Sequence, residues 1–396
     1  MSLPVRFILF IVIISVITSC SNSTSSSPEP TSGTLKIITS TSGEDLDMEY
    51  TISVNGESLT LSTNDTTSIN LPKGNYSAEL SGIAANCEIN SANPDNVIIT
   101  LGDTTEISFD INCKRMIRNK IVFSSDRMSN NYDRDIFIMD ADGSSPNRIT
   151  TNTYTDEFPT ISNDGTQIAF FSNRNSGYYN VYLMDADQSN LRQVTNIESS
   201  SYGTISFSPD DSKLVFKSNH EGDMEIYRIN IDGSNLTNLT NSQGIIDESP
   251  EWSPDGNRIL FESYISGEKQ LHTMNTDGTG LKQLTNTSYT EAAENPSWSP
   301  DGEKIAFSGY RNGQQDIYTI NKDGSGITQI TNNTGLDINP AWSADGSEII
   351  FTTDRDGQAE IYKVNADGSG LPTNMTANQA ADVSATWSPI GSLWIF

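Results

Sequence analysis

The chain has 396 residues and a formal net charge of −28, with 51 acidic against 23 basic side chains. A length of this order allows two or three domains. The acidic excess argues against nucleic acid or an anionic membrane surface as the main partner, and the acidic residues are spread along the chain, so they do not indicate a disordered body.

Residues 1–19 are predicted to form a signal peptide. Arg6 supplies a positive charge, and residues 7–17 are an apolar run too short to span a bilayer. The segment then reads Ile-Thr-Ser-Cys, which resembles a bacterial lipobox. That resemblance implies lipidation of Cys20, with acyl chains that hold an otherwise soluble body at a membrane. The alternative is an ordinary secretory signal with an incidental cysteine.

Residues 20–33 are rich in serine and proline and are predicted to be a disordered tether after the lipidated Cys20. The expected location is the bacterial cell envelope, with the protein lipid-anchored to the outer membrane. The sequence leaves open whether the body faces the periplasm or the cell surface.

Residues 34–114 contain about seven short runs of alternating polar and apolar residues, with an Asn55-Gly56 hairpin signal between two of them. This pattern predicts a small immunoglobulin-like β-sandwich. It resembles the β-sandwich modules at the front of many secreted bacterial proteins.

Cys87 and Cys113 are the only cysteines besides Cys20. In an exported chain such a pair predicts a disulfide with a structural role. The alternative is two free or metal-binding thiols, but no further cysteine or nearby histidine could complete a metal site.

From residue 115 to 396 the chain consists of one repeat. A turn, in its fullest form Trp-Ser-Pro-Asp-Gly, has its last residue at 165, 211, 256, 302, 346 and 391, so the period is 44 to 46 residues. Proline, aspartate and glycine suit successive positions of a tight turn between two strands. The residues assigned to these repeat turns are Trp252, Pro254, Asp255, Gly256, Trp298, Pro300, Asp301, Gly302, Trp342, Gly346, Trp387 and Pro389.

Each unit has four strand-like segments in the same order and no helical periodicity, which predicts a six-bladed β-propeller. The Trp-Ser-Pro-Asp-Gly turn, the Ile-Ala-Phe strand, the Ile-Tyr-x-Met/Ile strand and the Asx-x-Asp-Gly turn resemble the WD40-like repeats of the TolB propeller family. The resemblance covers about 280 of the 396 residues. It implies an all-β fold and binding of envelope proteins. The recurring tryptophans are expected to pack between blades.

The first unit lacks a Trp-Ser-Pro strand, and residues 385–389 supply one at the end of the chain. The simplest closure pairs this strand with the first blade, which removes an open edge. Residues 392–396 resemble a further copy of the apolar strand, and the sequence gives them no place in this closure.

The sequence shows no set of catalytic, cofactor-binding or metal-binding residues. His220 and His272 lie in different repeats, and no catalytic or phosphate-binding motif is present. The Asx-x-Asp-Gly turns could offer oxygens to calcium, but they lack the remaining ligands of a calcium loop, so a hydrogen-bonded turn is the favoured interpretation.

Two functions stay open. The favoured hypothesis is a non-enzymatic, monomeric binding protein whose propeller acts as a scaffold for an envelope protein. The alternative is a carbohydrate-binding or carbohydrate-active propeller at the cell surface. Related propellers also cap hydrolases, but such enzymes need an α/β-hydrolase domain, for which residues up to 396 leave no room. Recognition is expected in the segments that differ between repeats, which are 173–179, 242–248 and 287–294.

Overall fold

The computed structural model describes residues 29–128, 133–175, 177–200, 203–265, 267–286 and 291–389. All regular structure in these ranges is β-strand, and the strands form eight four-stranded sheets. No helix in the described ranges is long and apolar enough to cross a bilayer. The predicted signal peptide, Cys20 and residues 392–396 lie outside the described residues.

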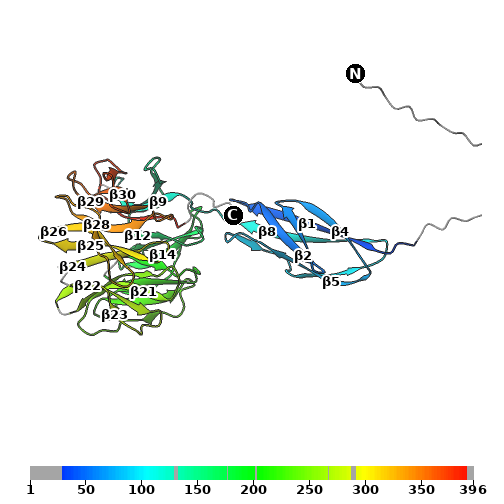
Figure 1. Cartoon of the computed structure of the whole chain (residues 1–396), viewed down its shortest axis with the longest axis horizontal. Coiled ribbons are helices and arrows are strands. Elements are labelled where there is room, and N and C mark those ends of the chain that lie inside the picture. The colour runs from blue at the N-terminus through cyan, green and yellow to red at the C-terminus, as the bar shows by residue number, and fades with distance from the viewer. Residues whose placement is uncertain are drawn as a thin grey trace, which may run out of the picture.

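The first eight strands form a two-sheet sandwich that lies beside the propeller (Figure 1). One sheet has the order β4-β1-β8-β6 and the other the order β3-β2-β5-β7. The strands are β1 (Gly33–Gly43), β2 (Glu49–Val54), β3 (Glu57–Ser62), β4 (Thr66–Leu71), β5 (Gly74–Ser81), β6 (Cys87–Ile89), β7 (Asp95–Ile99) and β8 (Thr104–Cys113).

Alternating side chains of both sheets fill one core, which includes Leu35, Tyr50 and Phe109, all fully buried. A β-sandwich is therefore present, while its immunoglobulin-like class and the predicted domain boundaries stay predictions. Strand β6 was not predicted from the sequence, because three residues are too few to show an alternating pattern.

The predicted disulfide is present and joins Cys87 of β6 to Cys113 of β8, which are direct partners across the two strands. Replacing both cysteines by alanine is expected to lower the free energy of unfolding of the sandwich by about 3 kcal/mol, because the open chain regains loop entropy. Chemical denaturation with a probe on each unit checks this. A matching loss in the propeller would contradict a role confined to the sandwich.

The remaining strands form the six predicted blades of the propeller. Blades 2 and 3 contain β12 (Asp156–Ile161), β13 (Gln167–Ser172), β14 (Asn180–Asp185), β15 (Arg192–Gln193), β16 (Ile205–Phe207), β17 (Lys213–Ser218), β18 (Glu225–Asn230) and β19 (Thr237–Asn238). Blades 4 and 5 contain β20 (Asp247–Trp252), β21 (Arg258–Ile265), β22 (Glu268–Asn275), β23 (Lys282–Gln283), β24 (Ala292–Trp298), β25 (Lys304–Arg311), β26 (Gln314–Asn321) and β27 (Thr328–Gln329). Blade 6 contains β28 (Asp337–Trp342), β29 (Glu348–Thr353), β30 (Glu360–Asn365) and β31 (Thr373–Asn374).

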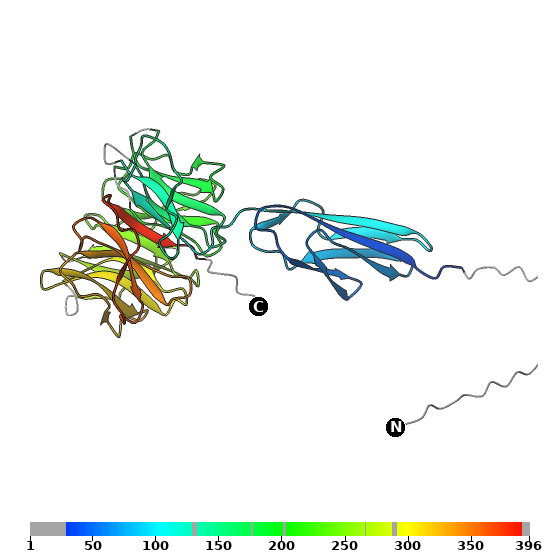
Figure 2. The same ribbon diagram turned by 90° about the horizontal axis from the view of Figure 1, so that it is seen from above.

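Blade 1 is assembled from both ends of the propeller sequence. Its strands are β9 (Lys120–Ser125), β10 (Asp135–Asp140) and β11 (Asn147–Arg148), completed by the C-terminal β32 (Asp382–Trp387). β32 pairs antiparallel with β9, so that Trp387 lies opposite Ile121. In Figure 2 the red C-terminal strand accordingly lies within the ring. The predicted closure is confirmed.

The Trp-Ser-Pro-Asp-Gly turns use their own polar groups. In the turn of blade 4 the Gly256 N–H donates to the Ser253 carbonyl at 2.9 Å, and Gly256 has a φ of +72°, which favours glycine. The Ser253 hydroxyl donates to Asp255 at 2.6 Å and accepts the Arg258 N–H at 2.9 Å. These contacts join the first strand of the blade to the second.

The tryptophan before each turn packs between two blades. Trp298 belongs to one buried cluster with Leu260 and Leu271 of blade 4, and it lies opposite Ile305 of its own blade. Trp252, Trp342 and Trp387 fill the equivalent places between other blades, and all four side chains are at most 9% exposed. The side chains are therefore fixed within the walls of the ring.

The two ends of the ring differ in what they carry. Because the strands of a blade are antiparallel, the repeat turns lie at one end, which we call the turn face. The linker from the sandwich contacts this end, where the Ile117 N–H donates to the Gly165 carbonyl at 2.8 Å. The opposite end carries the turns between the second and third strands and the loops between blades, and we call it the variable face.

Candidate binding site in the propeller channel

The innermost strands line the central channel, and most of them bulge at the same position. In five blades the register shifts next to a residue with a left-handed backbone, and Asn295 and Asn339 suit this geometry better than most side chains. The five residues are Phe158, Ser249, Asn295, Asn339 and Ser384.

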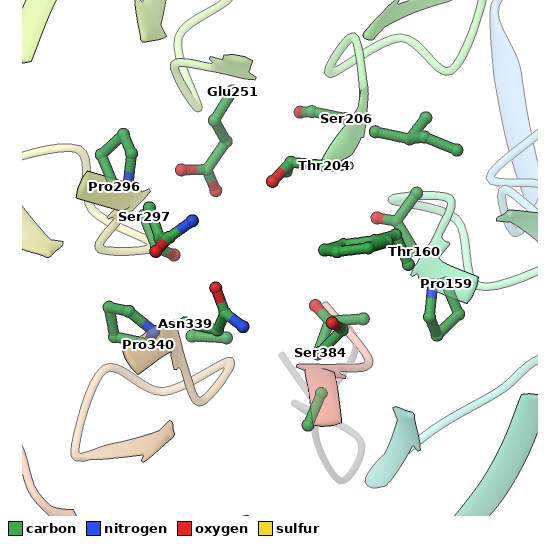
Figure 3. A pocket seen from close by; sticks show the side chains of 16 residues that line it. Pro159, Thr160, Thr204, Ser206, Glu251, Pro296, Ser297, Asn339, Pro340 and Ser384 are labelled. Atoms are coloured by element: carbon green, nitrogen blue, oxygen red, sulfur yellow. The ribbon is translucent and has the colours of Figure 1, made fainter. Parts of the chain in front are cut away.

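Two cavities follow one another along the channel. The variable-side cavity has a volume of about 120 Å³ and is lined by residues that include Phe158, Asn339 and Ser384. The turn-side cavity has a volume of about 340 Å³ and reaches the tryptophans of the repeat turns. Figure 3 shows side chains of the variable-side cavity arranged around one opening.

Both cavities share a ring of six residues, one from each blade, which we call the waist. All six occupy the same position of the repeat, immediately before the tryptophan or its equivalent. They are Thr160, Ser206, Glu251, Ser297, Ala341 and Thr386. Five of them are small and neutral, so the sixfold pattern is broken only by Glu251.

Glu251 is the single titratable residue among the described residues that line either cavity. One of its carboxylate oxygens accepts the backbone N–H of Trp298 at 2.7 Å. The carboxylate points toward the opening in Figure 3. Burial raises the pKa of Glu251 to about 8, although hydrogen bonds from the Trp298 backbone and the Ser297 side chain oppose the rise. The carboxyl group is therefore mostly neutral at pH 7.

Blades 1, 2 and 6 share an arginine clip next to the variable face. In blade 6, Arg355 stacks 5.4 Å from the centre of the Phe351 ring and 4.7 Å from that of Tyr362, and it bonds Asp337 at 3.0 Å. Arg127 and Arg174 make the equivalent contacts in blades 1 and 2. A stacked and ion-paired arginine ties the second, third and innermost strands of a blade together.

Blades 4 and 5 depart from this pattern. Their second and third strands are eight residues long instead of six, and Ile265 stands where blade 2 has Arg174. Asp247 of blade 4 therefore lacks the arginine partner, and one of its buried oxygens has no hydrogen-bond partner among the described residues. The innermost strand of blade 4 therefore lacks the tie that the clip provides in blades 1, 2 and 6.

A network of charged side chains replaces the clips between blades 3, 4 and 5. Glu248 bonds Lys217 at 2.6 Å and Lys269 at 2.9 Å. Lys269 also lies 3.6 Å from Glu262 and 3.4 Å from Glu294. We call these five residues the charged network.

The charged network contacts two channel bulges directly. Glu262 accepts the Asn295 N–H at 3.0 Å and bonds the Ser249 hydroxyl at 3.2 Å. Elsewhere a serine accepts the N–H of the bulge residue, as Ser308 does for Asn339. In blade 4 a carboxylate has thus replaced the serine that supports the channel wall.

The carboxyl groups of the charged network differ in proton affinity. Burial opposes ionisation of Glu248, but the ammonium groups of Lys217 and Lys269 hold its pKa at about 2. Burial raises the pKa of Glu262 to about 7, and Lys269 limits the rise. Since folding lowers the pKa of Glu248, its ion pairs stabilise the fold above about pH 4 and are lost as the pH falls toward 2.

Replacing Lys269 by methionine is expected to lower the free energy of unfolding by about 2 kcal/mol, because three carboxylates lose a partly buried counterion. The matched control is Lys322→Met, which removes an exposed ammonium paired with Glu303 and is expected to leave stability unchanged. Denaturant titration at pH 7 measures both. Equal behaviour of the two variants would show that the network does not support blades 4 and 5.

The exposed tyrosines of the propeller gather on the variable face. Tyr264 and Tyr310 end the lengthened strands of blades 4 and 5 and are 45% and 38% exposed. Tyr154 and Tyr178 lie on loops of the same face. At the turn face the exposed apolar side chains are leucines spread along the outer rim, at positions 191, 236, 281 and 371.

The segments expected to carry recognition belong to this same face. Residues 173–179 connect β13 to β14, and residues 242–248 lead into β20. The Tyr264 N–H bonds the Ile246 carbonyl at 2.9 Å, which joins the second segment to a lengthened hairpin. Of the third segment, 287–294, residues 287–290 lie outside the described residues.

The two histidines take structural positions. His220 stands at the clip position of blade 3, with its ring 4.6 Å from that of Tyr227. His272 is buried beside Phe261, and burial lowers the pKa of His272. Among the described residues, no group of three or more His, Cys, Asp or Glu side chains could hold a metal ion.

The Asx-x-Asp-Gly turns have the hydrogen bonds of an Asx turn. Asp277 accepts the N–H and the hydroxyl of Thr279 at 2.9 and 2.6 Å. Asp323 makes the same pair of bonds with Ser325. These carboxylates are used within their own turns, as the turn interpretation expects.

Comparison with known proteins agrees with the propeller geometry. The family model described as the TolB beta propeller domain matches residues 196–295 and 282–396. The chain belongs to the TolB β-propeller family. No curated protein matches this chain.

Solved structures of TolB proteins share the fold. TolB from Acinetobacter baumannii has a TM-score of 0.61 and 18% identity, with 80% of each chain covered. A putative TolB from Agrobacterium tumefaciens has a TM-score of 0.54 and 20% identity, over 69% of this chain and 95% of that one. A chain of a nidogen/laminin complex has a TM-score of 0.56 and 8% identity, over 67% and 97%. At these sequence identities the likeness concerns the fold alone. The binding site of this TolB-family propeller is therefore inferred from the residues of this chain.

Proposed function

We propose that this chain is an exported, lipid-anchored envelope protein whose propeller binds a partner protein at the variable face, as a monomer and without catalysis. The observation that carries the proposal is the departure of blades 4 and 5 from the repeat. There the arginine clip gives way to longer hairpins, the charged network and exposed tyrosines.

The chemistry of this face suits a protein partner. Tyrosine is enriched in protein interfaces, because it buries a large area at little entropic cost and keeps a polar group. The linker contact at Gly165 leaves the opposite face clear of the sandwich attachment. Membership of the TolB family and the likeness to a chain solved within a nidogen/laminin complex support a protein-binding role.

Capture from the envelope of the source cells tests this proposal. The full chain is compared with Tyr264→Ala/Tyr310→Ala and with the control Leu281→Ala/Leu371→Ala, which alters side chains at least as exposed on the turn face. The tyrosine variant is expected to lose the captured partner, whereas the leucine variant keeps it. Equal capture by all three proteins would refute binding at the variable face.

The lipid anchor is tested separately. Cys20→Ala removes the proposed acylation site and is expected to move the protein from the membrane fraction to the soluble fraction, because the remaining body is acidic and carries no other proposed anchor. Fractionation of cells that express each form measures the change. A variant that still sediments with membranes would contradict lipidation at Cys20.

A carbohydrate ligand is the second candidate, since the same exposed tyrosines could stack on sugar rings. In that case the tyrosine variant would lose binding to a glycan array rather than to a captured protein. Turnover of any glycan by the mature protein would revive the carbohydrate-active alternative.

A further inference from the structure

The waist of the channel combines five neutral residues with one carboxyl group. In blade 3 a serine occupies this position and joins two blades, because the Ser206 hydroxyl accepts the backbone N–H of Trp252 at 3.1 Å. Glu251 makes the equivalent bond to the Trp298 N–H in blade 5. Closing the gap between blades therefore does not require a carboxylate, and its presence calls for a second role.

We infer that Glu251 binds a primary ammonium group carried on a slender stem by the partner protein, which enters the channel from the variable face. The inference rests on the proposed function and names the chemistry of its partner. The ammonium belongs either to a lysine side chain or to a free amino terminus, since both offer three N–H donors on a narrow group.

The dimensions of the channel favour such a group. The variable-side cavity has a volume of about 120 Å³, well below the roughly 300 Å³ at which pockets for drug-sized ligands begin. Its wall offers side-chain oxygens from Asn295, Asn339 and Ser384, which are acceptors for N–H groups passing toward the waist. A single narrow side chain fits this passage, whereas a folded segment does not.

The charge of the channel also favours a cation. No basic residue is found among the described residues that line either cavity, so nothing there neutralises an ionised Glu251. Of the charged side chains on the strands next to β20, Lys217, Glu262 and Glu294 pair within the charged network. Lys213 and Arg258 instead bond the Ser212 hydroxyl and the Gly280 carbonyl. One carboxylate among neutral oxygens satisfies one ammonium, whereas calcium requires six to eight oxygen ligands.

Binding of this kind is coupled to proton release. The carboxyl group is mostly protonated at pH 7 in the free protein, because burial raises its pKa to about 8, and an ammonium requires the ionised form. Affinity should therefore rise as the pH approaches 8, level off above it, and fall once the amine loses its proton, near pH 10.4 for a lysine side chain. The other five waist residues have no titratable group that could give the same dependence.

The test uses saturation-transfer NMR on the mature protein with n-butylammonium as the probe. Glu251→Gln keeps an oxygen for the Trp298 N–H but cannot ionise, and it is expected to weaken binding about tenfold. For the unaltered protein, affinity is expected to be roughly twentyfold higher at pH 8.5 than at pH 6.5. Tetramethylammonium, which has the charge but no N–H donor, is expected not to compete.

Two further probes separate the sources of the ammonium. Nα-acetyl-lysine methylamide presents it on a side chain, and glycylglycinamide presents it at an amino terminus, so the tighter binder identifies the source. Equal binding of n-butylammonium to the unaltered protein and to a folded Glu251→Gln variant would overturn the inference, as would an affinity that does not change between pH 6.5 and 8.5. Equal partner capture by the full chain and by the Tyr264→Ala/Tyr310→Ala variant, with ammonium binding intact, would instead refute only the proposed function.

Discussion

Replacing Trp298 by alanine is expected to lower the free energy of unfolding of the propeller by about 3–5 kcal/mol. The side chain is 8% exposed and belongs to a buried cluster between blades 4 and 5 that includes Leu260, Leu271 and Ile305. The rigid strands around it cannot close over the resulting cavity, so the variant loses both the buried area and the contacts of the wall.

The control for this substitution is Leu371→Ala, because Leu371 is 91% exposed at the outer rim. Denaturation followed by tryptophan fluorescence for the leucine variant, and by circular dichroism for both variants, gives the two changes in free energy. The control is expected to behave as the unaltered protein. A loss below about 1 kcal/mol in Trp298→Ala would contradict a structural role of the repeat tryptophans between blades.

Removal of β32 is expected to lower the solubility of the protein more than the Trp298→Ala substitution does. A chain that stops at Ala381 loses the strand that pairs with β9, and with it Trp387. Blade 1 is then left with three strands and an open edge, which invites association with other chains. The expected result is loss of the monomer and loss of cooperative unfolding.

The matched control is a chain that stops at Pro389, which keeps the whole register between β32 and β9, from Asp382 to Trp387. Size-exclusion chromatography with light scattering compares the two truncated chains. If the chain ending at Ala381 were a stable monomer, closure of the ring by the C-terminal strand would not be needed for the fold.

The sequence was sufficient to predict the propeller because the residues that recur in each repeat are those that form turns and pack between blades. Each Trp-Ser-Pro-Asp-Gly copy specifies a turn by local chemistry, and each tryptophan fills the same place between blades. The spacing of the copies then gives the number of blades. The cysteine count of an exported chain likewise predicted the Cys87–Cys113 disulfide, but not the three-residue strand β6 that carries Cys87.

The site was harder to predict because it consists of departures from the repeat. Glu251 precedes Trp252 as an ordinary acidic residue in a chain with 51 acids, and its burial appears only when six blades close around it. A comparison of the residue before each tryptophan would have singled it out. The charged network is harder to predict from the sequence, because Lys217, Lys269 and Glu294 come from three different blades and are brought together only by the fold.

The arginine clips show the opposite case. Arg127, Arg174 and Arg355 recur in the turns after the second strand, where a polar residue is expected on the sequence alone. Their stacking on paired rings depends on a register that places Phe351 opposite Tyr362, which the sequence does not display. Among the described residues the clip contacts occur in blades 1, 2 and 6 and not in blades 3, 4 and 5, and only blades 4 and 5 also have lengthened hairpins. These two blades are therefore the most specialised part of the variable face.

Site-specific photocrosslinking tests most directly whether the variable face at blades 4 and 5 contacts a partner protein. A benzoyl-phenylalanine crosslinker is placed at Tyr264 or Tyr310 of the full chain in its own envelope, and at Leu281 or Leu371 as the turn-face control. We expect one protease-sensitive adduct common to the two tyrosine positions and absent from the two leucine positions. Adducts at the leucine positions alone, or at none of the four, would contradict it.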